Sequence, residues 1–336
     1  MQTTKETDMP DLRTTYMGLK LKNPIIVGSG PLTANLDNLR KCEDAGAGAV
    51  VLKSIFEEQI NYVAGKDTKV NSPYLEFSDF QDAFGHMSKD YYVDMYLKLL
   101  SEAKSSLSIP VIASINCTHI DTWSEYAQRF EKVGADALEL NYYPIASDAS
   151  VSGDKVDKDA IAFAKAARKM TSLPVSMKIG FEYSSLAGII KGFEREKING
   201  LVLFNHFFRP DIDIENEKMC GSQSVSTENE YSESLRWIAL MAGETKKMDL
   251  VGNTGIHSGD TVVKMLLAGA KAVELCSVLM QNGLGAIAGM LCKIENWMDQ
   301  KGYKNLGDFC GKLAQDNMSD GAYWERTQYM RTLRNI

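Results

Sequence analysis

The stretch Glu131-Lys-Val-Gly-Ala-Asp-Ala-Leu-Glu-Leu-Asn141 contains the pattern that decides the fold. A helix-like segment ends at a glycine, one or two small residues follow, and an apolar run then ends in a polar residue. Glycine suits the position after a helix because it adopts the left-handed conformation, and a short apolar run is typical of a strand buried on both faces. The pattern recurs in Glu43–Lys53, Glu196–Asn205 and Leu267–Cys276. This recurrence predicts repeated βα units.

Four further apolar runs complete the set of predicted strands, namely Pro24–Gly28, Pro110–Ile115, Pro174–Ile179 and Asp249–Gly252. Amphipathic segments lie between the strands, such as Leu284–Ile294, whose apolar residues recur at helical spacing. Eight strands that alternate with helices favour a (β/α)₈ TIM barrel of the α/β class. No low-complexity linker divides the chain, so we expect residues 1–336 to form a single domain.

Three segments do not fit a plain barrel. Thr14–Lys22 alternates apolar with polar or small residues around Gly18, which predicts an N-terminal hairpin that plugs one end. The connections from Ser54 to about Pro110 and from Phe207 to about Asp249 are too long for simple βα loops. Both follow predicted strands, so we expect them to cover the C-terminal mouth, where barrel enzymes place their active sites.

Composition and charge exclude several classes of protein. Lys and Arg number 37 against 44 Asp and Glu, a net charge of −7, so we expect no nucleic acid partner and no anionic membrane surface. The six cysteines are widely spaced, which excludes CxxC zinc sites and iron–sulfur runs, and no metal site is predicted. Met1–Pro10 has no apolar core of a signal peptide, and glycine and polar residues interrupt Leu275–Cys292. A cytoplasmic enzyme without a membrane segment is expected.

Each predicted strand ends in small or polar residues, and in a barrel these ends converge on one mouth. A lysine or asparagine at the tail of an apolar strand costs desolvation free energy unless something polar fills the mouth. A solvated loop explains one such residue equally well, but several together favour a ligand. The strand-end residues are Gly28-Ser29-Gly30, Lys53-Ser54, Asn116-Cys117, Asn141, Lys178, Asn205, Asn253-Thr254-Gly255 and Cys276-Ser277.

Two of these turns indicate a phosphate site. Gly252-Asn-Thr-Gly-Ile256 follows the seventh strand and Cys276-Ser277 follows the eighth, where barrels commonly hold a phosphate on backbone amides. Glycine permits close approach of the backbone, and the hydroxyl groups of Thr254 and Ser277 add donors. Either turn alone is a weak signal, whereas the pair is stronger.

The order of these motifs resembles that of the class 1 dihydroorotate dehydrogenases. The resemblance runs from about Thr14 to Lys312 and rests on Asn23–Gly30, Leu52–Ser54, Glu139–Asn141, Met177-Lys178, Gly252–Ile256 and Gln300–Lys312. It implies an FMN-containing barrel, usually a homodimer, which acts on a small-molecule substrate. The implied reaction oxidises dihydroorotate to orotate in pyrimidine biosynthesis, with hydride transfer to flavin N5.

The resemblance also implies a role for each matched strand end. Lys178 approaches the N1/O2 edge of the flavin and stabilises its reduced state, and Lys53 lies near flavin and substrate as a catalytic residue. Thr254, Gly255, Cys276 and Ser277 hold the ribityl phosphate. The full set of implied cofactor-binding residues is Gly28, Ser29, Gly30, Lys53, Ser54, Asn141, Lys178, Asn205, Asn253, Thr254, Gly255, Cys276 and Ser277.

Two departures from the family pattern affect the substrate side. The family's N-x-S-C-P-N motif, which carries the cysteine base, corresponds here to Asn141-Tyr-Tyr-Pro-Ile-Ala146 and lacks the cysteine. The orotate-binding loop N-S-M-G-L-P-N corresponds to something like Gln81–Met87, in which two asparagines have no counterpart. A site built to hydrogen-bond a polar ring loses discrimination without those partners.

A replacement base is therefore needed, and the candidates are Cys117, Tyr143, His119 and His86. Our hypothesis is that Cys117 or Tyr143 serves, although a cysteine is more often a small core residue and a tyrosine with an ordinary pKa near 10 needs activation. The alternative is an FMN enzyme of the same fold with a different cyclic or unsaturated substrate. A flavin-free phosphate-binding lyase or isomerase, and a flavin-binding protein without turnover, stay open.

Overall fold

The eight predicted strands form a closed parallel barrel in the computed structural model, which describes residues 9–57, 89–117, 119–207, 209–221 and 225–327. The order β4-β3-β13-β12-β9-β8-β7-β6 closes because β4 also pairs with β6. The predicted barrel is therefore confirmed. Its strands are β3 (Ile25–Val27), β4 (Ala49–Val51), β6 (Val111–Asn116), β7 (Ala137–Tyr142), β8 (Val175–Ile179), β9 (Gly200–Leu203), β12 (Asp249–Gly252) and β13 (Ala272–Leu275).

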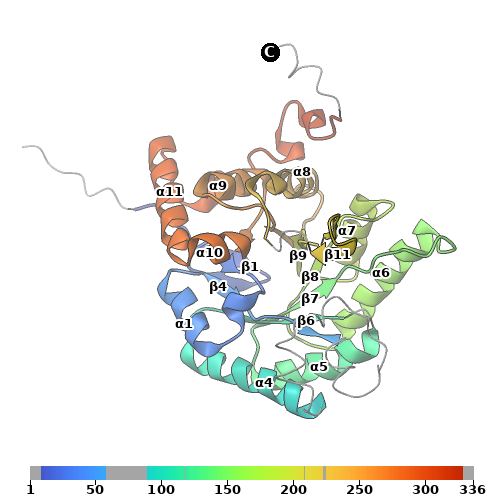
Figure 1. Ribbon diagram of the computed structural model, residues 1–336. Coiled ribbons are helices and arrows are strands. Elements are labelled where there is room, and N and C mark those ends of the chain that lie inside the picture. The colour runs from blue at the N-terminus through green and yellow to red at the C-terminus, as the bar shows by residue number, and fades with distance from the viewer. Residues whose placement is uncertain (1–8, 58–88, 118, 208, 222–224, 328–336) are drawn as a thin grey trace, which may run out of the picture.

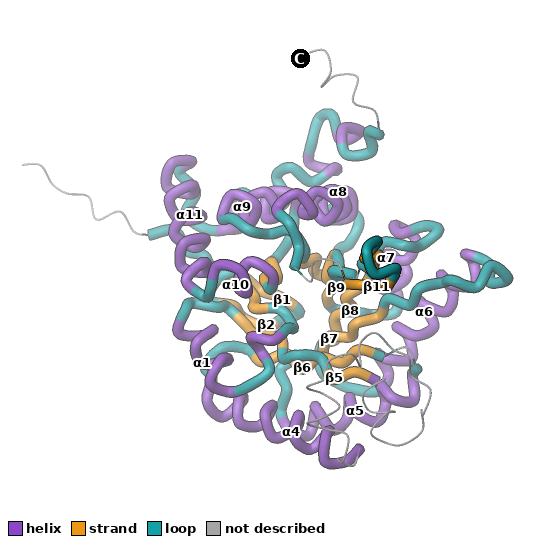
Figure 2. The backbone as a smooth tube through the Cα atoms, in the orientation of Figure 1, coloured by secondary structure: helices purple, strands orange, loops and turns teal. Residues whose placement is uncertain are grey.

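Helices surround the strands, as Figures 1 and 2 show. Gly134 and Gly269 take φ angles of 95° and 118° at the ends of α5 and α9, as the glycine in each junction predicted. At the junction before β9 the same conformation falls on Lys197, with φ of 64°. The helices are α1 (Leu36–Asp44), α4 (Lys89–Ser106), α5 (Ile120–Val133), α6 (Gly153–Lys169), α7 (Leu186–Arg195), α8 (Tyr231–Met241), α9 (Gly259–Ala268), α10 (Ser277–Asn282) and α11 (Gly285–Lys301).

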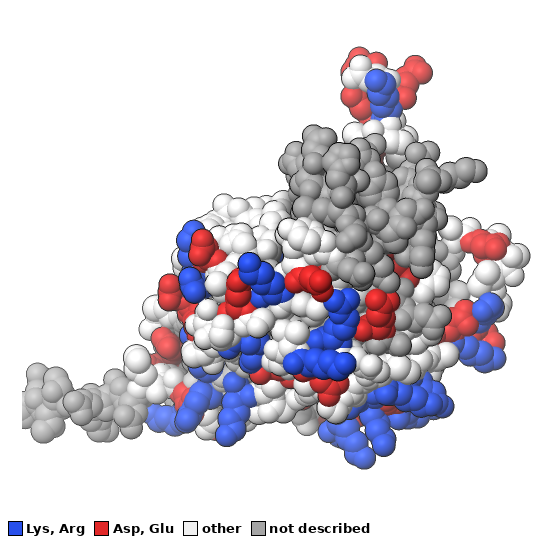
Figure 3. All heavy atoms as spheres, turned by 90° about the horizontal axis from the view of Figure 1, so that it is seen from below, with Lys and Arg blue, Asp and Glu red and all other residues white. Residues whose placement is uncertain are grey.

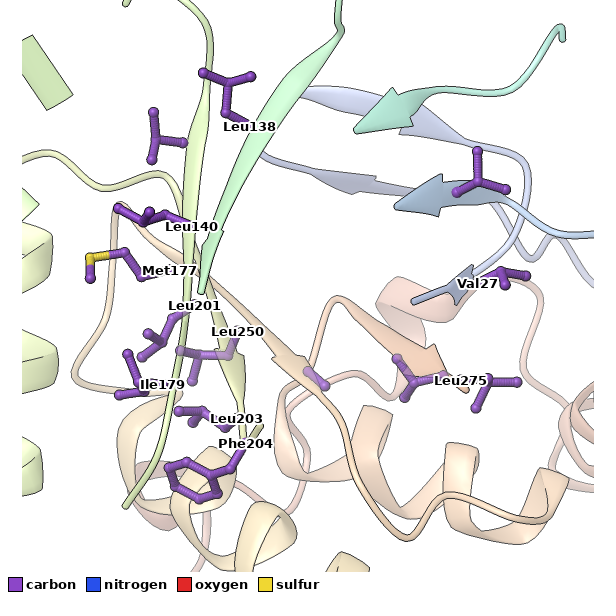
Figure 4. Packing of buried hydrophobic residues seen from close by; sticks show 14 of the residues in the cluster. Val27, Leu138, Leu140, Met177, Ile179, Leu201, Leu203, Phe204, Leu250 and Leu275 are labelled. Atoms are coloured by element: carbon purple, nitrogen blue, oxygen red, sulfur yellow. The ribbon is translucent and has the colours of Figure 1, made fainter. Parts of the chain in front are cut away.

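The main hydrophobic core lies between the strands and the helices. Figure 4 shows Leu140, Met177 and Ile179 of β7 and β8 pointing to the same side, toward the surrounding helices. On the helix side, Trp123 and Phe130 of α5 are fully buried in this core. Their burial follows from the helical spacing of apolar residues and removes large apolar surfaces from water.

A separate cluster fills the N-terminal end of the barrel. The predicted hairpin consists of β1 (Thr14–Tyr16) and β2 (Leu19–Leu21), joined at Met17 and Gly18 with positive φ. Tyr16, Met17 and Leu21 pack against inward-facing residues of the barrel strands. The amide of Met17 donates to Asp249 Oδ2 at 2.8 Å, at the start of β12. We call this end, made of β1, β2 and the strand residues they contact, the plug.

The two long connections carry additional elements. The first begins with β5 (Ile55–Phe56), which pairs with β6, and ends in α4. The second contains an exposed hairpin, β10 (Pro210–Asp213) and β11 (Lys218–Gly221), followed by the 3₁₀ helix η3 (Glu228–Glu230) and α8. The other 3₁₀ helices are η1 (Pro31–Thr33), η4 (Leu306–Asp308), η5 (Gln315–Asn317) and η6 (Gly321–Tyr323).

Among the described residues, no helix combines the length and the apolar character that crossing a bilayer requires. Within the same ranges, His, Cys, Asp and Glu side chains form no group of three or more suited to a metal ion. The face seen in Figure 3 carries Lys and Arg side chains beside Asp and Glu side chains.

Candidate active site

A cavity of about 380 Å³ lies at the C-terminal mouth, where the turns after β3, β12 and β13 meet. It brings together most of the predicted cofactor residues. Pro31, His206, Ser226 and Glu274 also contribute to the wall. The predicted residues that line it are Ser29, Gly30, Lys178, Asn205, Asn253, Thr254, Gly255, Cys276 and Ser277.

Two glycines allow these turns to approach one another. A Cβ atom on Gly30 would lie 2.6 Å from Cys276 Sγ, and one on Gly255 would lie 2.2 Å from the backbone nitrogen of Tyr231. Gly255 also has φ of 74°, in the left-handed region. Gly255 is thus required by close packing against the backbone at the start of α8, and Gly30 by its contact with the Cys276 side chain.

The polar side chains of the turn after β12 stabilise the turn itself. Asn253 Nδ2 and Thr254 Oγ1 both donate to the carbonyl oxygen of Phe204, at 2.7 and 2.9 Å. The hydroxyl group of Thr254 already donates its proton, so toward any further partner it can act only as an acceptor. Thr254 has φ of 69°, which a β-branched residue rarely adopts.

Ser226 links the two turns that we predicted to hold a phosphate. The amide of Gly255 donates to Ser226 Oγ at 3.2 Å, and the amide of Ser226 donates to Ser277 Oγ at 2.9 Å. His257 Nε2 lies 3.2 Å from the same Ser226 hydroxyl. The two amides are engaged in these bonds, and the hydroxyl groups of Ser226 and Ser277, which line the cavity, are donors suited to a phosphate monoester. Sequence reasoning missed Ser226 because nothing local marks it within the long connection.

Three buried charged groups meet inside the barrel next to the cavity. Lys178 Nζ donates to Glu274 Oε2 at 2.8 Å and lies 3.9 Å from Glu139 Oε1. The lysine side chain is 7% exposed and both glutamate side chains are fully buried. Burial alone would lower the pKa of Lys178, but the charges of Glu274 and Glu139 outweigh burial and raise it.

Glu139 has a different environment from Glu274. Burial, and then the nearby Glu274 charge, raise the pKa of Glu139 well above its ordinary value, whereas Lys178 opposes this effect. Neither carboxyl oxygen of Glu139 accepts a hydrogen bond from the described residues. A buried carboxylate without donors is costly, so the charged form of Glu139 is less favourable than that of an ordinary glutamate. We refer to Lys178, Glu139 and Glu274 together as the charge cluster.

Gly28, Ser54 and Asn141 lie beside the cavity without lining it. Ser54 Oγ is 3.0 Å from Ser29 Oγ and accepts from Asn141 Nδ2 at 2.7 Å. Asn141 Oδ1 is buried and receives no hydrogen bond from the described part of the chain. An unsatisfied buried acceptor requires a donor from elsewhere, such as a ligand.

A second cavity of about 870 Å³ adjoins the first and shares Asn205, His206, Asn253 and Thr254 with it. Phe181, Phe204 and Phe207 form an aromatic wall, in which the Phe181 ring meets the other two edge-on. Pro144, Ile145 and Ala146, from the loop after β7 that lacks the cysteine, also line it. The two cavities together offer space for a cofactor and a separate organic substrate.

None of the three base candidates within the described residues lines either cavity. Cys117 is 1% exposed, belongs to the hydrophobic core and lines neither cavity. Tyr143 Oη accepts from Asn116 Nδ2 at 2.5 Å, and its ring meets Phe207 edge-on. His119 Nδ1 lies 2.9 Å from Glu57 Oε1, away from both cavities. Lys53 is exposed and lines neither cavity.

Two predictions lie outside the described residues, namely His86 and the Gln81–Met87 loop.

His206, which sequence reasoning did not single out, lines both cavities. Its Nε2 lies 3.5 Å from Glu230 Oε2, and Arg209 Nη2 donates to the same oxygen at 2.6 Å. Burial lowers the pKa of His206; Glu230 opposes this effect and Arg209 adds to it. The imidazole is therefore neutral near pH 7 and able to accept a proton. Its position directly after the strand-end residue Asn205 was the one available signal.

The sequence comparisons agree with this geometry. A model of the dihydroorotate dehydrogenase family matches residues 11–298. The chain is 26% identical to the catalytic subunit of dihydroorotate dehydrogenase B (NAD(+)) from Thermoplasma volcanium, over 90% of this chain and 98% of that protein. It is 27% identical to a putative dihydroorotate dehydrogenase A (fumarate) from Aeropyrum pernix, over 90% of this chain and 97% of that protein. Its identity to dihydropyrimidine dehydrogenase (NADP(+)) of Arabidopsis thaliana is 24%, over 91% of this chain and 78% of that protein. The chain therefore belongs to the dihydroorotate dehydrogenase family.

Proposed function

We propose that the chain is an FMN-dependent oxidoreductase that acts on a CH–CH bond of a small ring, with dihydroorotate, oxidised to orotate, as the leading substrate. The observation that carries the proposal is the 380 Å³ cavity, in which Lys178, Asn205 and the two glycine-bearing turns converge beside a second cavity. When bound, FMN accepts the hydride that leaves the substrate.

The residues present fit FMN at several points. Ser226 and Ser277, which line the cavity, would supply hydroxyl groups for the phosphate, because their oxygens accept backbone amides and their protons can point to a ligand. Lys178 lines the cavity and supplies a positive charge near the ring that gains electrons. The buried Asn141 Oδ1 has no donor within the described part of the chain, and a flavin ring N–H would supply one. Homodimerisation, a single-domain chain and a cytoplasmic location stay predictions.

Removal of hydrogen from a CH–CH bond also requires a proton acceptor, and His206 suits this role better than Cys117 or Tyr143. It lines both cavities, whereas Cys117 lies in the core. Glu230, held by Arg209 and by the amide of Thr227 at 2.7 Å, faces His206 Nε2 and favours the tautomer with its proton on that nitrogen. The lone pair of Nδ1 is then available as the general base.

A second candidate function is the same chemistry on another cyclic or unsaturated substrate. The loop after β7 has no cysteine, and the similar proteins include dihydropyrimidine dehydrogenases as well as dihydroorotate dehydrogenases. An aromatic wall of Phe181, Phe204 and Phe207 beside the cofactor cavity also suits substrates larger than dihydroorotate.

The absorbance spectrum of the purified protein tests the cofactor, and an anaerobic titration tests the substrate. Flavin bands that bleach with dihydroorotate support the first function. Bleaching by dihydrouracil, a dihydropyrimidine without the carboxylate, but not by dihydroorotate, supports the second. A protein that is colourless and does not bind added FMN contradicts both and favours a flavin-free barrel enzyme.

A further inference from the structure

The charge cluster reaches the wall of the cavity that we propose for the flavin. Lys178 and Glu274 both line the cofactor cavity, and Glu139 lies behind them, fully buried. Lys178 Nζ is 2.8 Å from Glu274 Oε2 and 3.9 Å from Glu139 Oε1, so both carboxyl groups act on the same ammonium. Solvent screens buried charges only weakly, so the electrostatic interactions among these three groups are strong.

The hydrogen bonding distinguishes the two carboxyl groups. Glu274 accepts the hydrogen bond of Lys178 through Oε2, whereas neither oxygen of Glu139 accepts one from the described residues. Lys178 and Glu274 therefore form the close, hydrogen-bonded ion pair, and Glu139 is a more distant neighbour. The carboxylate of Glu274 thus offsets the positive charge of the lysine that lines the cavity.

We propose that Glu274 is a positioning residue that holds the Lys178 ammonium and cancels its charge, so that a flavin in this cavity is harder to reduce than Lys178 alone would make it. This inference rests on the proposed function. Reduction adds negative charge to the flavin, which a lone ammonium stabilises and a neutral ion pair stabilises far less. Glu274 thus sets how strong a reductant the substrate must be.

The test is the midpoint potential of the FMN-loaded full-length protein, measured against a redox dye under equilibrium conditions. Glu274→Gln keeps the shape of the side chain and removes its charge. At the potential where the wild type is half reduced, we expect the ratio of reduced to oxidised flavin to rise at least tenfold. For a two-electron couple this corresponds to an upward shift of about 30 mV.

Glu139→Gln is the matched control, because it alters an equally buried carboxyl of the same cluster that lies 3.9 Å from Lys178 Nζ and does not accept its hydrogen bond. We expect a smaller upward shift of its midpoint than in Glu274→Gln. In Glu274→Gln, Glu139 still offsets part of the lysine charge, so the double variant Glu139→Gln/Glu274→Gln gives the largest upward shift. If Glu274→Gln does not fold, Glu274→Asp withdraws the carboxylate from Lys178 and shifts the midpoint upward by less.

Two outcomes overturn the inference and are distinguishable. Variants that bind FMN with the midpoint of the wild type, the double variant included, show that Glu274 is only a structural partner of Lys178 and leave the proposed function intact. A wild-type protein that neither contains nor binds FMN contradicts the proposed function and this inference together.

Discussion

The plug and the mouth are two ends of one barrel, but their interiors have opposite chemistry. At the plug, Tyr16, Met17 and Leu21 contact small and branched apolar residues of the strands, and the Met17 amide donates to the partly exposed Asp249 carboxyl. At the mouth, the interior holds Lys178 and two glutamates that solvent does not reach. The same alternation of inward-facing side chains therefore produces a dry core at one end and a buried charged site at the other.

This difference indicates that the mouth, rather than the plug, is the end of the barrel that binds a ligand. Burial of apolar side chains stabilises the fold directly, whereas burial of charges costs desolvation free energy even when the charges are paired. Tyr16 of the plug lies near enough to the charge cluster that, besides burial, the charges of Glu274 and Glu139 raise the pKa of its phenol. The buried charges cost free energy that an apolar cluster would not, so their presence points to a ligand.

The largest expected effect is at the mouth, in the reaction itself. With the substrate that reduces the flavin, His206→Gln slows reduction by about 10²–10⁴-fold, the usual contribution of a general base. The wild-type rate falls as the pH falls through the pKa of His206, which burial places below the ordinary value of 6.5, because a protonated imidazole accepts no proton. Stopped-flow absorbance measures both effects.

The double variant Cys117→Ser/Tyr143→Phe is the control for this experiment and retains most of the wild-type rate. If the double variant loses the rate and His206→Gln keeps it, the base is one of the two residues first inferred from the sequence.

The next effect tests whether the buried charges depend on one another. Lys178→Met leaves two buried carboxyl groups without a cation, and we expect it to lower the free energy of unfolding by about 3–5 kcal/mol. Without the lysine, these carboxyl groups bind protons more tightly in the folded than in the unfolded chain, so the loss shrinks as the pH falls. Urea unfolding of the cofactor-free protein at several pH values measures both.

Lys155→Met provides the comparison for the buried lysine. Lys155 forms a 2.6 Å ion pair with Asp159, but the two side chains are 60% and 54% exposed. Its removal changes the free energy of unfolding by less than about 1 kcal/mol. If Lys178→Met and Lys155→Met lowered the free energy of unfolding equally, the buried lysine would be no more important for stability than the exposed one, which contradicts our expectation.

Most of the fold could be predicted from the sequence because its signals are local. The glycine, small-residue and apolar pattern of Glu131–Asn141 became the end of α5, Gly134 at its C-cap and β7. The hairpin followed from alternation around Gly18. Each of these features depends on residues a few positions apart. They could therefore be predicted without knowing which strands pair to close the barrel.

The site could be predicted only in part because its decisive contacts are long-range. Lys178 was named from its strand end, but its partner Glu274 is 96 positions away and sits in an apolar run that reads as ordinary strand. The pairing exists only once β8 and β13 face each other across the closed barrel. Ser226 and the His206–Glu230 contact likewise arise from the long connection after β9, whose path no local pattern fixes.

A smaller effect tests the packing of the plug. A Cβ atom on Gly200 would lie 2.6 Å from Tyr16 Oη and 2.9 Å from Met17 Cγ. We expect Gly200→Ala to cost about 1–3 kcal/mol through overpacking and to leave FMN affinity unchanged. Gly289→Ala on α11, where a Cβ meets nothing within 4 Å, stabilises the protein by about 0.5–1 kcal/mol instead. A loss of FMN affinity in Gly200→Ala would show that the two ends are coupled.

The smallest effect compares strained backbone at the two ends. Lys197, exposed in the loop before β9 at the plug end, has φ of 64°, and Thr254 in the cofactor cavity has φ of 69°. Lys197→Gly relieves strain and loses no described contact, so we expect a gain of about 0.5 kcal/mol in the free energy of unfolding.

Thr254→Gly relieves the same strain but removes the 2.9 Å bond from Oγ1 to the Phe204 carbonyl and a wall of the cofactor cavity. We expect a net loss of about 1 kcal/mol together with weaker FMN binding, as thermal unfolding with and without FMN measures. Strain at the mouth is maintained by contacts that hold the site, whereas strain in the loop at the plug end has no such support. A stabilised Thr254→Gly variant with normal FMN affinity would remove this distinction between the two ends.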